Sequence, residues 1–427
     1  MLYYREKREL NILKKINFYL TIILMCFIIT PYLNRNLKKE FYLILITWSL
    51  SAFMVILLNR FKIKYKKILI IIFLWCLWFV FLRVIGYSSA AWGNYINSLI
   101  FYFLFFIMAF LETYIDKEKI KKLIKYILIF ITINLIDNIY LNFKFINANT
   151  LIFTDYGKKY LKTNIGTTNF SAMIFLFSGI LMILFLNKKD KLNKLIYLIG
   201  IILSCFLVFY QHGRATATII SIFLLLSLIF EKLYYNNKNN KKIFLQISIC
   251  IFIILVIIPS MKLIINIIGN DRIIERFNSI INFLSGKGSV GISGGDSFDT
   301  RTYLILISIK TFFLNIKNFI IGTGYNLIKT YSMSEMIAKT GVGYHSELTD
   351  VLGTYGIIGG ISIFLILKYM WDILKKKSKV NIINLQVRTI YVAFIIFSIF
   401  NLSFSSDIGI IVIIVLPNIH LIIEEKK

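Results

Sequence analysis

His345, Glu347 and Asp350 lie close together in a polar, glycine-rich segment, GVGYHSELTD, which runs directly into an apolar stretch long enough to cross a membrane. A histidine suits the role of general base because its unperturbed pKa lies near the operating pH. Ionisable groups at the border of a bilayer are uncommon, and they favour a functional site. The segment also fits a polar helix start with Ser346, Thr349 or Asp350 as the N-cap, and the two interpretations are compatible.

Arg214 lies in a second polar segment, FYQHGRATATI, where one apolar stretch ends and the next begins almost at once. A guanidinium group stays charged and grips phosphate through two parallel hydrogen bonds. The alternative is an arginine that snorkels or sets the topology. Basic residues are disfavoured on the outer face, to which we assign this turn, so we favour a specific anionic partner. His212 competes with His345 for the role of base, whereas His420 falls near the cytoplasmic end of the last apolar stretch.

Arg301 follows the residues FDT and opens a helix-periodic stretch in the longest polar region of the chain. Its partner is either substrate or one of the nearby carboxylates, Asp296 and Asp299, in an ordinary solvated contact. Arg276 lies beside Glu275 and fits a charged helix face, with a substrate contact as the second interpretation. We expect further substrate contacts from polar neighbours in these segments: Gln211, His212, Arg276, Tyr344 and Glu347.

The sequence offers no pattern typical of a metal or nucleotide site. Its four cysteines lie within apolar stretches without CxxC spacing, so neither a metal site nor a disulfide framework is indicated. No carboxylate or histidine cluster has the spacing of a divalent-metal site. The run from Gly286 to Ser289 fails the GxxxxGK[ST] pattern of a phosphate loop. We therefore expect chemistry without a metal or a cofactor.

The composition predicts an all-α polytopic membrane protein. Hydrophobic residues make up 58% of the 427 residues and charged residues only 16%, and apolar runs of spanning length recur along the whole chain. The formal net charge of +28 would suit nucleic acid, but the lysines cluster in short loops between the apolar runs. That distribution is the positive-inside pattern, so no nucleic-acid partner is expected.

We predict twelve spans in a single membrane domain, residues 1–427, without a cleavable signal peptide. Alternating lysine-rich loops place both termini in the cytoplasm, although the basic loop Asn34–Glu40 would then lie outside. Residues 269–349 form one large extracytoplasmic loop, in which Arg301–Ile321 is either an amphipathic helix on the membrane surface or a short re-entrant span. The predicted spans are approximately 17–33, 41–58, 68–85, 96–115, 123–143, 168–186, 195–210, 215–230, 243–265, 350–368, 389–404 and 408–423.

Three charged residues inside predicted spans, Arg83, Asp137 and Lys262, fall towards the outer leaflet in this topology. Intramembrane charges normally face a cavity or one another. Together with Arg214 and His345 they could line one outward-facing cationic pocket, while each alone fits a snorkelling or paired residue.

The order of these motifs resembles the O-antigen ligase and polymerase superfamily of integral-membrane enzymes. The resemblance rests on QHGRATATI at the outer turn, TRTYLILISI and IGTGYN in the large loop, and GYHSELTDVLGTYGIIGG before a span, so it covers about residues 200–370. Members of that family show an arginine before small residues, a loop arginine, Gly-x-Gly, and then a histidine. The polar residue that usually follows the histidine is Ser346 here.

This resemblance implies the membrane glycosyltransferase fold of the C type and a donor glycan on undecaprenyl pyrophosphate. Arg214 and Arg301 would hold the pyrophosphate, and His345 would take the proton from the attacking hydroxyl. The expected function is polymerisation of repeat units for capsule, exopolysaccharide or O-antigen at a bacterial inner or plasma membrane. The alternatives are a glycan ligase with the same donor, a lipid-linked oligosaccharide flippase, and a scaffold protein. A chain-length regulator and a flippase of the same pathway are expected partners.

Overall fold

The structure, a computed structural model, describes residues 2–84, 92–146, 168–212, 215–236, 298–323, 337–338, 340–377 and 380–423. Within these ranges the chain is helical and contains no strand, which confirms the all-α prediction for this part. Seven of the described helices are long and apolar enough to cross a membrane, so the chain is a helical, membrane-embedded protein. These seven candidate spans are Arg8–Ile29, Lys38–Leu58, Lys117–Leu141, Lys191–Val208, Ala217–Tyr235, Glu347–Lys375 and Asn381–Phe400.

The twelve-span count stays a prediction. Three further apolar helices, shorter than the seven, coincide with predicted spans: Leu99–Tyr114, Ala172–Asn187 and Ser406–Asn418. The predicted span 68–85 is matched by the helix α4 (Lys66–Val84), and the predicted span 243–265 lies outside the described residues.

The described chain divides into two compact units by its internal contacts. The first unit contains residues from three parts of the sequence: 1–73, 96–174 and 405–427. Its helices are α1 (Leu2–Ile29), α2 (Pro31–Asn36), α3 (Lys38–Leu58), most of α5 (Trp92–Tyr114), α6 (Lys117–Ile146), α18 (Ser406–Gly409), η1 (Ile410–Val415), η2 (Leu416–Asn418) and α19 (His420–Ile423).

Antiparallel packing of α1 and α3 is the clearest pairing of the first unit. The indole N–H of Trp48 donates to Thr21 Oγ1 at 2.9 Å, and Asn17 Nδ2 donates to Ser51 Oγ at 2.8 Å. Polar side chains buried in a membrane need such partners because no water is present to replace them. The basic connection between the two helices is short and itself mostly helical, since α2 fills it.

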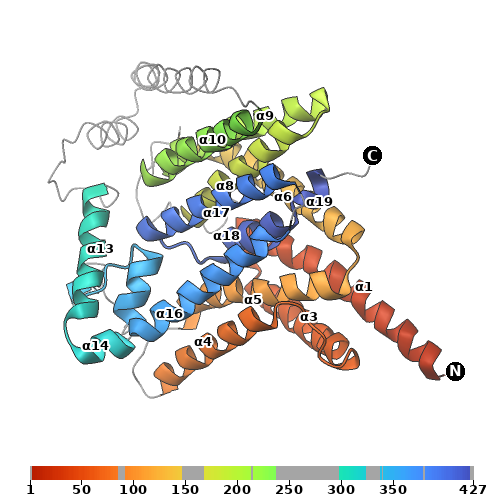
Figure 1. The fold of residues 1–427 in the computed structure, drawn as a ribbon, viewed down its shortest axis with the longest axis horizontal. Coiled ribbons are helices and arrows are strands. Elements are labelled where there is room, and N and C mark those ends of the chain that lie inside the picture. Colours follow the sequence, from red (N-terminus) through yellow and green to blue (C-terminus); the bar gives the residue numbers. More distant parts are fainter. Residues whose placement is uncertain are drawn as a thin grey trace. The chain divides into compact units, whose positions relative to one another are not determined.

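The second unit holds residues 74–95 and 175–404, and it carries the candidate site. Its helices include most of α8 (Thr168–Asn187), α9 (Lys191–His212), α10 (Ala215–Asn236), α13 (Phe298–Phe313), α14 (Ile316–Ile321), α16 (Glu347–Lys375) and α17 (Asn381–Phe400). Figure 1 shows α10, α17 and α16 side by side within this unit.

A buried aromatic and aliphatic core joins these long helices. The rings of Phe175 and Phe397 lie 5.1 Å apart, and the hydroxyl of Tyr391 donates to the carbonyl of Leu367 at 2.8 Å. Gly179 lets α8 approach α10 closely, because a Cβ at this position would lie 2.9 Å from Leu224 Cδ2 of α10. Small residues at such crossings are the usual means by which helices pack tightly in membranes.

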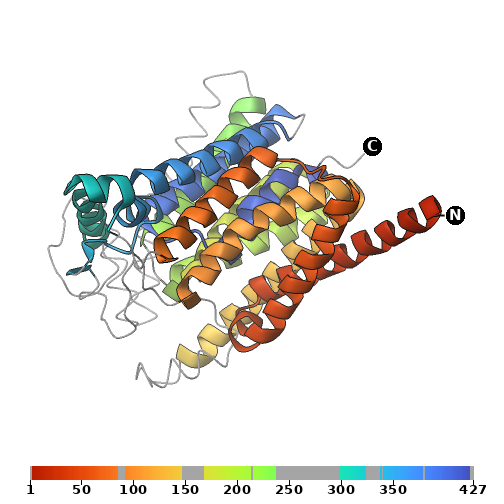
Figure 2. The ribbon, with the colours of Figure 1, turned by 90° about the horizontal axis from the view of Figure 1, so that it is seen from below.

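The stretch predicted as a single helix from Arg301 to Ile321 is two helices in the structure. The side chain of Asn315 accepts from the amide of Asn318 at 2.8 Å and caps α14, so α13 ends before this turn. One face of α13 is buried, with Arg301, Leu304, Ser308 and Thr311 at helical spacing. Its place on the membrane surface or in a re-entrant span stays a prediction. That buried face packs against α16 (Figures 1 and 2).

Candidate functional site

Arg301 is buried at the start of α13, with only 3% of its surface exposed. Its Nη1 donates to the backbone carbonyl of Phe400 at 2.6 Å and to Asn401 Oδ1. Phe400 is the last residue of α17, where helix carbonyls lack partners within the helix and the helix dipole favours a cation. The guanidinium group therefore ties the start of α13 to the end of α17. Asp296 and the side chain of Asp299 lie outside the described part of the structure, so the contact with them that the sequence suggests stays a prediction.

Residues 340–346 form a strap that lies against α13. Thr311 Oγ1 donates to the carbonyl of Gly341 at 2.6 Å, and the amide of Gly343 donates to Ser308 Oγ at 2.9 Å. A Cβ on Gly343 would lie 2.4 Å from the carbonyl oxygen of Leu304, so only glycine permits this approach. These contacts fix the position of the strap along α13.

Tyr344 is buried within this strap in a left-handed backbone conformation, with φ of 53°. Its hydroxyl donates to Thr340 Oγ1 at 2.8 Å. Burial raises the pKa of the Tyr344 phenol above its usual value, although the hydrogen bond with Thr340 opposes this shift. The phenol is therefore neutral at physiological pH, and its hydrogen bond to Thr340 stabilises the strap.

The start of α16 is capped as the sequence predicts. Ser346 is the N-cap, and its Oγ accepts from the amide of Thr349 at 3.2 Å. Asp350 Oδ2 accepts from the amide of Ser346 at 2.8 Å, and its Oδ1 accepts from Ser308 Oγ at 2.6 Å. Because Ser308 also receives the Gly343 amide, one serine of α13 joins the strap to the first turn of α16.

Glu347 binds the segment that follows α17. Its Oε2 accepts from the amides of Ser403 and Phe404 at 3.0 and 3.1 Å, and its own amide donates to the carbonyl of Asn401 at 3.2 Å. Asn401 thus contacts Arg301 through its side chain and Glu347 through its backbone. These bonds hold the segment after α17 against the start of α16, and the contact of Glu347 with substrate stays a prediction.

His345 is half-buried between the strap and the first turn of α16. Its Nδ1 lies 2.7 Å from the carbonyl oxygen of Tyr344. A carbonyl oxygen can only accept, so this bond requires the proton on Nδ1 and places the lone pair of the neutral ring on Nε2. An imidazole held in one tautomer with a basic Nε2 is suited to accept a proton from a hydroxyl group.

A kink in α16 helps to fix this region. Gly356 has φ of 64° and ψ of −159° inside the helix, and a Cβ there would lie 2.4 Å from the carbonyl oxygen of Ile320. One turn earlier, the carbonyl of Gly353 accepts from the amide of Thr323 at 2.9 Å, just after α14. The first part of α16 therefore packs closely against α14 and lies in a different direction from the rest of the helix (Figure 1).

Four of the eight predicted site residues belong to this cluster: Arg301, Tyr344, His345 and Glu347. Gln211 and His212 end α9, but their side chains are outside the described part of the structure. Arg214 and Arg276 lie outside the described residues, as does Lys262. The outward-facing cationic pocket therefore stays a prediction.

Two structural members of the cluster, Ser308 and Asn401, were missed from the sequence. Ser308 resembles any small polar residue of an amphipathic helix, and its two bonds depend on segments far along the chain. Asn401 had one weak signal in the sequence: it begins the polar run NLSFSSD near the end of a predicted span. Among the described residues, no group of three His, Cys, Asp or Glu side chains is placed to hold a metal ion.

Comparison with known proteins assigns no family: no protein-family model matches the chain, and no curated protein matches it either.

Proposed function

We propose that this protein is a membrane glycosyltransferase that joins polyprenyl-pyrophosphate-linked oligosaccharide repeat units into longer chains. In this proposal the enzyme has twelve spans with both termini in the cytoplasm of a bacterium, and it acts on the outer face of the inner or plasma membrane. The observation that carries the proposal is the link through Asn401, which joins Arg301 of α13 to the helix start that follows His345. A cation and a base from segments far apart in the sequence are thereby held in one cluster.

The proposed reaction uses the two groups in complementary roles. A sugar hydroxyl of the acceptor attacks the anomeric carbon of the donor, and its proton passes to Nε2 of His345. The bond between the anomeric carbon and the pyrophosphate oxygen breaks, and the polyprenyl pyrophosphate leaves with the bonding electron pair. Arg301 and Arg214 stabilise the charge that develops on the leaving group. Pyrophosphate is already a good leaving group, so the reaction needs no general acid.

The decisive assay is the ladder of glycan lengths made by the purified full-length protein from a lipid-linked repeat unit. We expect His345→Ala to lower the rate by about a hundred- to ten-thousand-fold, the usual contribution of a positioned base. His420→Ala is the matched control, because that histidine lies in α19 near the C-terminus and has no part in the proposed reaction, so the ladder is expected to stay unchanged. His212→Ala tests the competing base.

The outcomes separate the proposal from its rivals. A normal ladder from the His345→Ala protein would eliminate this histidine as the base. Transfer of glycan only to a lipid acceptor would indicate a ligase, and movement of the intact donor across the bilayer without any new glycosidic bond would indicate a flippase. Loss of wild-type activity in EDTA, with rescue by a divalent ion, would contradict the metal-free reaction.

A further inference from the structure

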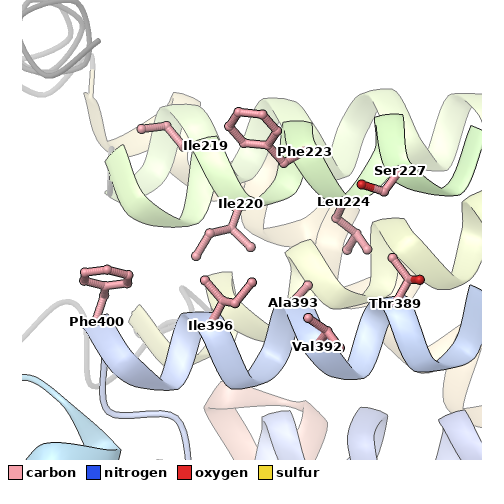
Figure 3. A pocket seen from close by; sticks show the side chains of 10 residues that line it. All are labelled: Ile219, Ile220, Phe223, Leu224, Ser227, Thr389, Val392, Ala393, Ile396 and Phe400. Carbon is pink, nitrogen blue, oxygen red and sulfur yellow. The ribbon is translucent and has the colours of Figure 1, made fainter. Parts of the chain in front are cut away.

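Two surface features lie outside the candidate site. One is an apolar groove of about 410 Å³ between α10 and α17 of the second unit (Figure 3). The described residues that line it include no charged side chain, so the chemistry of the groove selects no particular ligand. The other feature is the connection between α3 and α4 in the first unit, and it is strongly charged.

This connection, which we call the basic loop, consists of residues 59–67 with the sequence NRFKIKYKK and includes the first two residues of α4. It contains no carboxylate, and its five cations are all exposed: Arg60, Lys62, Lys64, Lys66 and Lys67. Within the part of the chain that the structure describes, none of these five side chains forms a hydrogen bond or an ion pair. The basic loop therefore presents positive charge that the described protein does not neutralise.

The basic loop begins with a tight turn at the end of α3. The amide of Arg60 donates to the carbonyl of Leu57 at 3.0 Å, and the amide of Phe61 donates to the carbonyl of Ile56 at 2.9 Å. These two bonds form the Schellman motif, whose left-handed position is usually occupied by glycine. Arg60 occupies that position with φ of 53°, and Phe61 follows with φ of 55°. Such a conformation strains a residue with a side chain, so glycine would suit position 60 better if the turn were its only role.

Three successive residues at the end of α5 hold the basic loop in place: Glu112, Thr113 and Tyr114. The hydroxyl of Tyr65 donates to Glu112 Oε2 at 2.5 Å, and the amide of Lys64 donates to Thr113 Oγ1 at 2.9 Å. The hydroxyl of Tyr114 donates to the carbonyl of Lys62. A loop that only sets the topology acts through its charge and needs no fixed shape. Its fixed shape therefore indicates a surface that binds a ligand.

The position of the basic loop along the chain places it at the level of lipid headgroups. The candidate span in α3 ends at Leu58, directly before the loop begins. Phe61 has 57% of its surface exposed, and an apolar ring beside cations is typical of segments that lie in the membrane interface. Lys14 of α1 adds a sixth cation, since its Nζ lies 5.7 Å from the centre of the Tyr114 ring. In the predicted orientation this is the cytoplasmic side, where anionic lipids make the membrane surface negative.

We infer that the basic loop binds the headgroups of anionic phospholipids. Its positive charge favours a lipid with net negative charge over a zwitterionic one. The guanidinium group of Arg60 can pair with a phosphodiester through two parallel hydrogen bonds, and the lysines add attraction without that geometry. The exposed ring of Phe61 favours a lipid over a soluble anion. The inference does not depend on the proposed function, because the basic loop belongs to the first unit and the candidate site to the second.

The test uses the full-length protein in nanodiscs that contain phosphatidylcholine and phosphatidylglycerol in equal parts. Lipids that stay bound after release from the nanodisc are counted by native mass spectrometry. We expect the wild-type protein to retain phosphatidylglycerol in preference to phosphatidylcholine. Replacing two lysines, by Lys62→Gln together with Lys64→Gln, keeps the backbone bonds to α5 and removes two charges. Retention of phosphatidylglycerol should then fall about fivefold for each lysine removed.

The matched control is Lys38→Gln together with Lys39→Gln. These two lysines are exposed and begin α3, at the end of the helix opposite to the basic loop. The control removes the same charge from the same unit, and we expect it to leave the retention of phosphatidylglycerol unchanged. An equal fall in both double variants would show that total charge alone attracts the lipid, and would overturn the inference.

Arg60→Gly separates lipid binding from the stability of the turn. Glycine relieves the left-handed strain, so this variant should unfold at a higher temperature than the wild type in nanodiscs of phosphatidylcholine alone. Phosphatidylglycerol should raise the unfolding temperature of the wild type, because a ligand of the folded state stabilises it, and should raise that of Arg60→Gly less. A rise as large in Arg60→Gly as in the wild type would count against the inference.

Competing ligands complete the experiment. Displacement of the retained phosphatidylglycerol by inorganic phosphate would assign the basic loop to a soluble anion. Displacement by polyglutamate would assign it to an acidic segment of a protein partner. Either displacement would overturn the inference, whereas retention in the presence of both competitors supports the binding of a lipid.

Discussion

Gly343→Ala is the sharpest structural test of the cluster. The new Cβ would lie 2.4 Å from the carbonyl oxygen and 2.8 Å from the carbonyl carbon of Leu304. These are backbone atoms of α13, so no side-chain rotation relieves the clash. To reach an ordinary contact of 3.4 Å the strap must retreat by about 1 Å. That movement breaks the 2.9 Å hydrogen bond between the Gly343 amide and Ser308 Oγ.

The expected cost combines two effects. A lost buried hydrogen bond costs about 1 kcal/mol and overpacking about 1–3 kcal/mol, so we expect the variant to be destabilised by about 2–4 kcal/mol. His345 lies two residues further along the strap, and a 1 Å misplacement of a catalytic group can cost about a hundredfold in rate. We therefore expect Gly343→Ala to lower polymerisation about a hundredfold while the inserted protein still folds.

The measurements are thermal unfolding in detergent and the glycan ladder, with Gly360→Ala as the control. A Cβ on Gly360 would meet only the flexible end of Leu352, and alanine is the better helix former, so that variant should be as stable as the wild type or more so. Wild-type stability and rate in Gly343→Ala would refute the described contact between the strap and α13.

Three further predictions concern the two arginines and the orientation of the chain in the membrane. Arg214→Lys should keep the positive charge but lose most polymerisation activity, because one ammonium group cannot form two parallel hydrogen bonds to phosphate. Activity near that of the wild type, measured at equal expression, would show that Arg214 only sets the topology or snorkels. Arg301→Lys should lower the free energy of unfolding by about 1–3 kcal/mol, because the carbonyl of Phe400 or the side chain of Asn401 loses its donor. Unchanged thermal unfolding in detergent would contradict that contact. Cysteines at 290 and 212 should react with a membrane-impermeant reagent only from outside, and one at 377 only from the cytoplasm; cytoplasmic labelling at 290 would reject the proposed orientation.

Local features of the sequence determined the helices and several of their ends. Uninterrupted apolar runs permit only helices within lipid, so the class of protein followed without tertiary information. An N-cap among Ser346, Thr349 and Asp350 and the helical spacing of Leu304 and Thr311 were likewise predictable, since both depend on neighbours within one or two turns. The burial of Arg301 was not predicted. The break at Asn315 was missed, although an asparagine is a good N-cap, because the apolar pattern continued across it.

Only the tertiary structure decided the partners of these residues. Arg301 and Asn401 are a hundred residues apart in the chain, as the numbering shows, and nothing local favours their bond over one with a nearby aspartate. The link from Asp350 to Ser308 and the closeness of Gly343 to Leu304 likewise require the strap to return along α13. Such pairings arise because buried polar groups must find partners wherever packing places them.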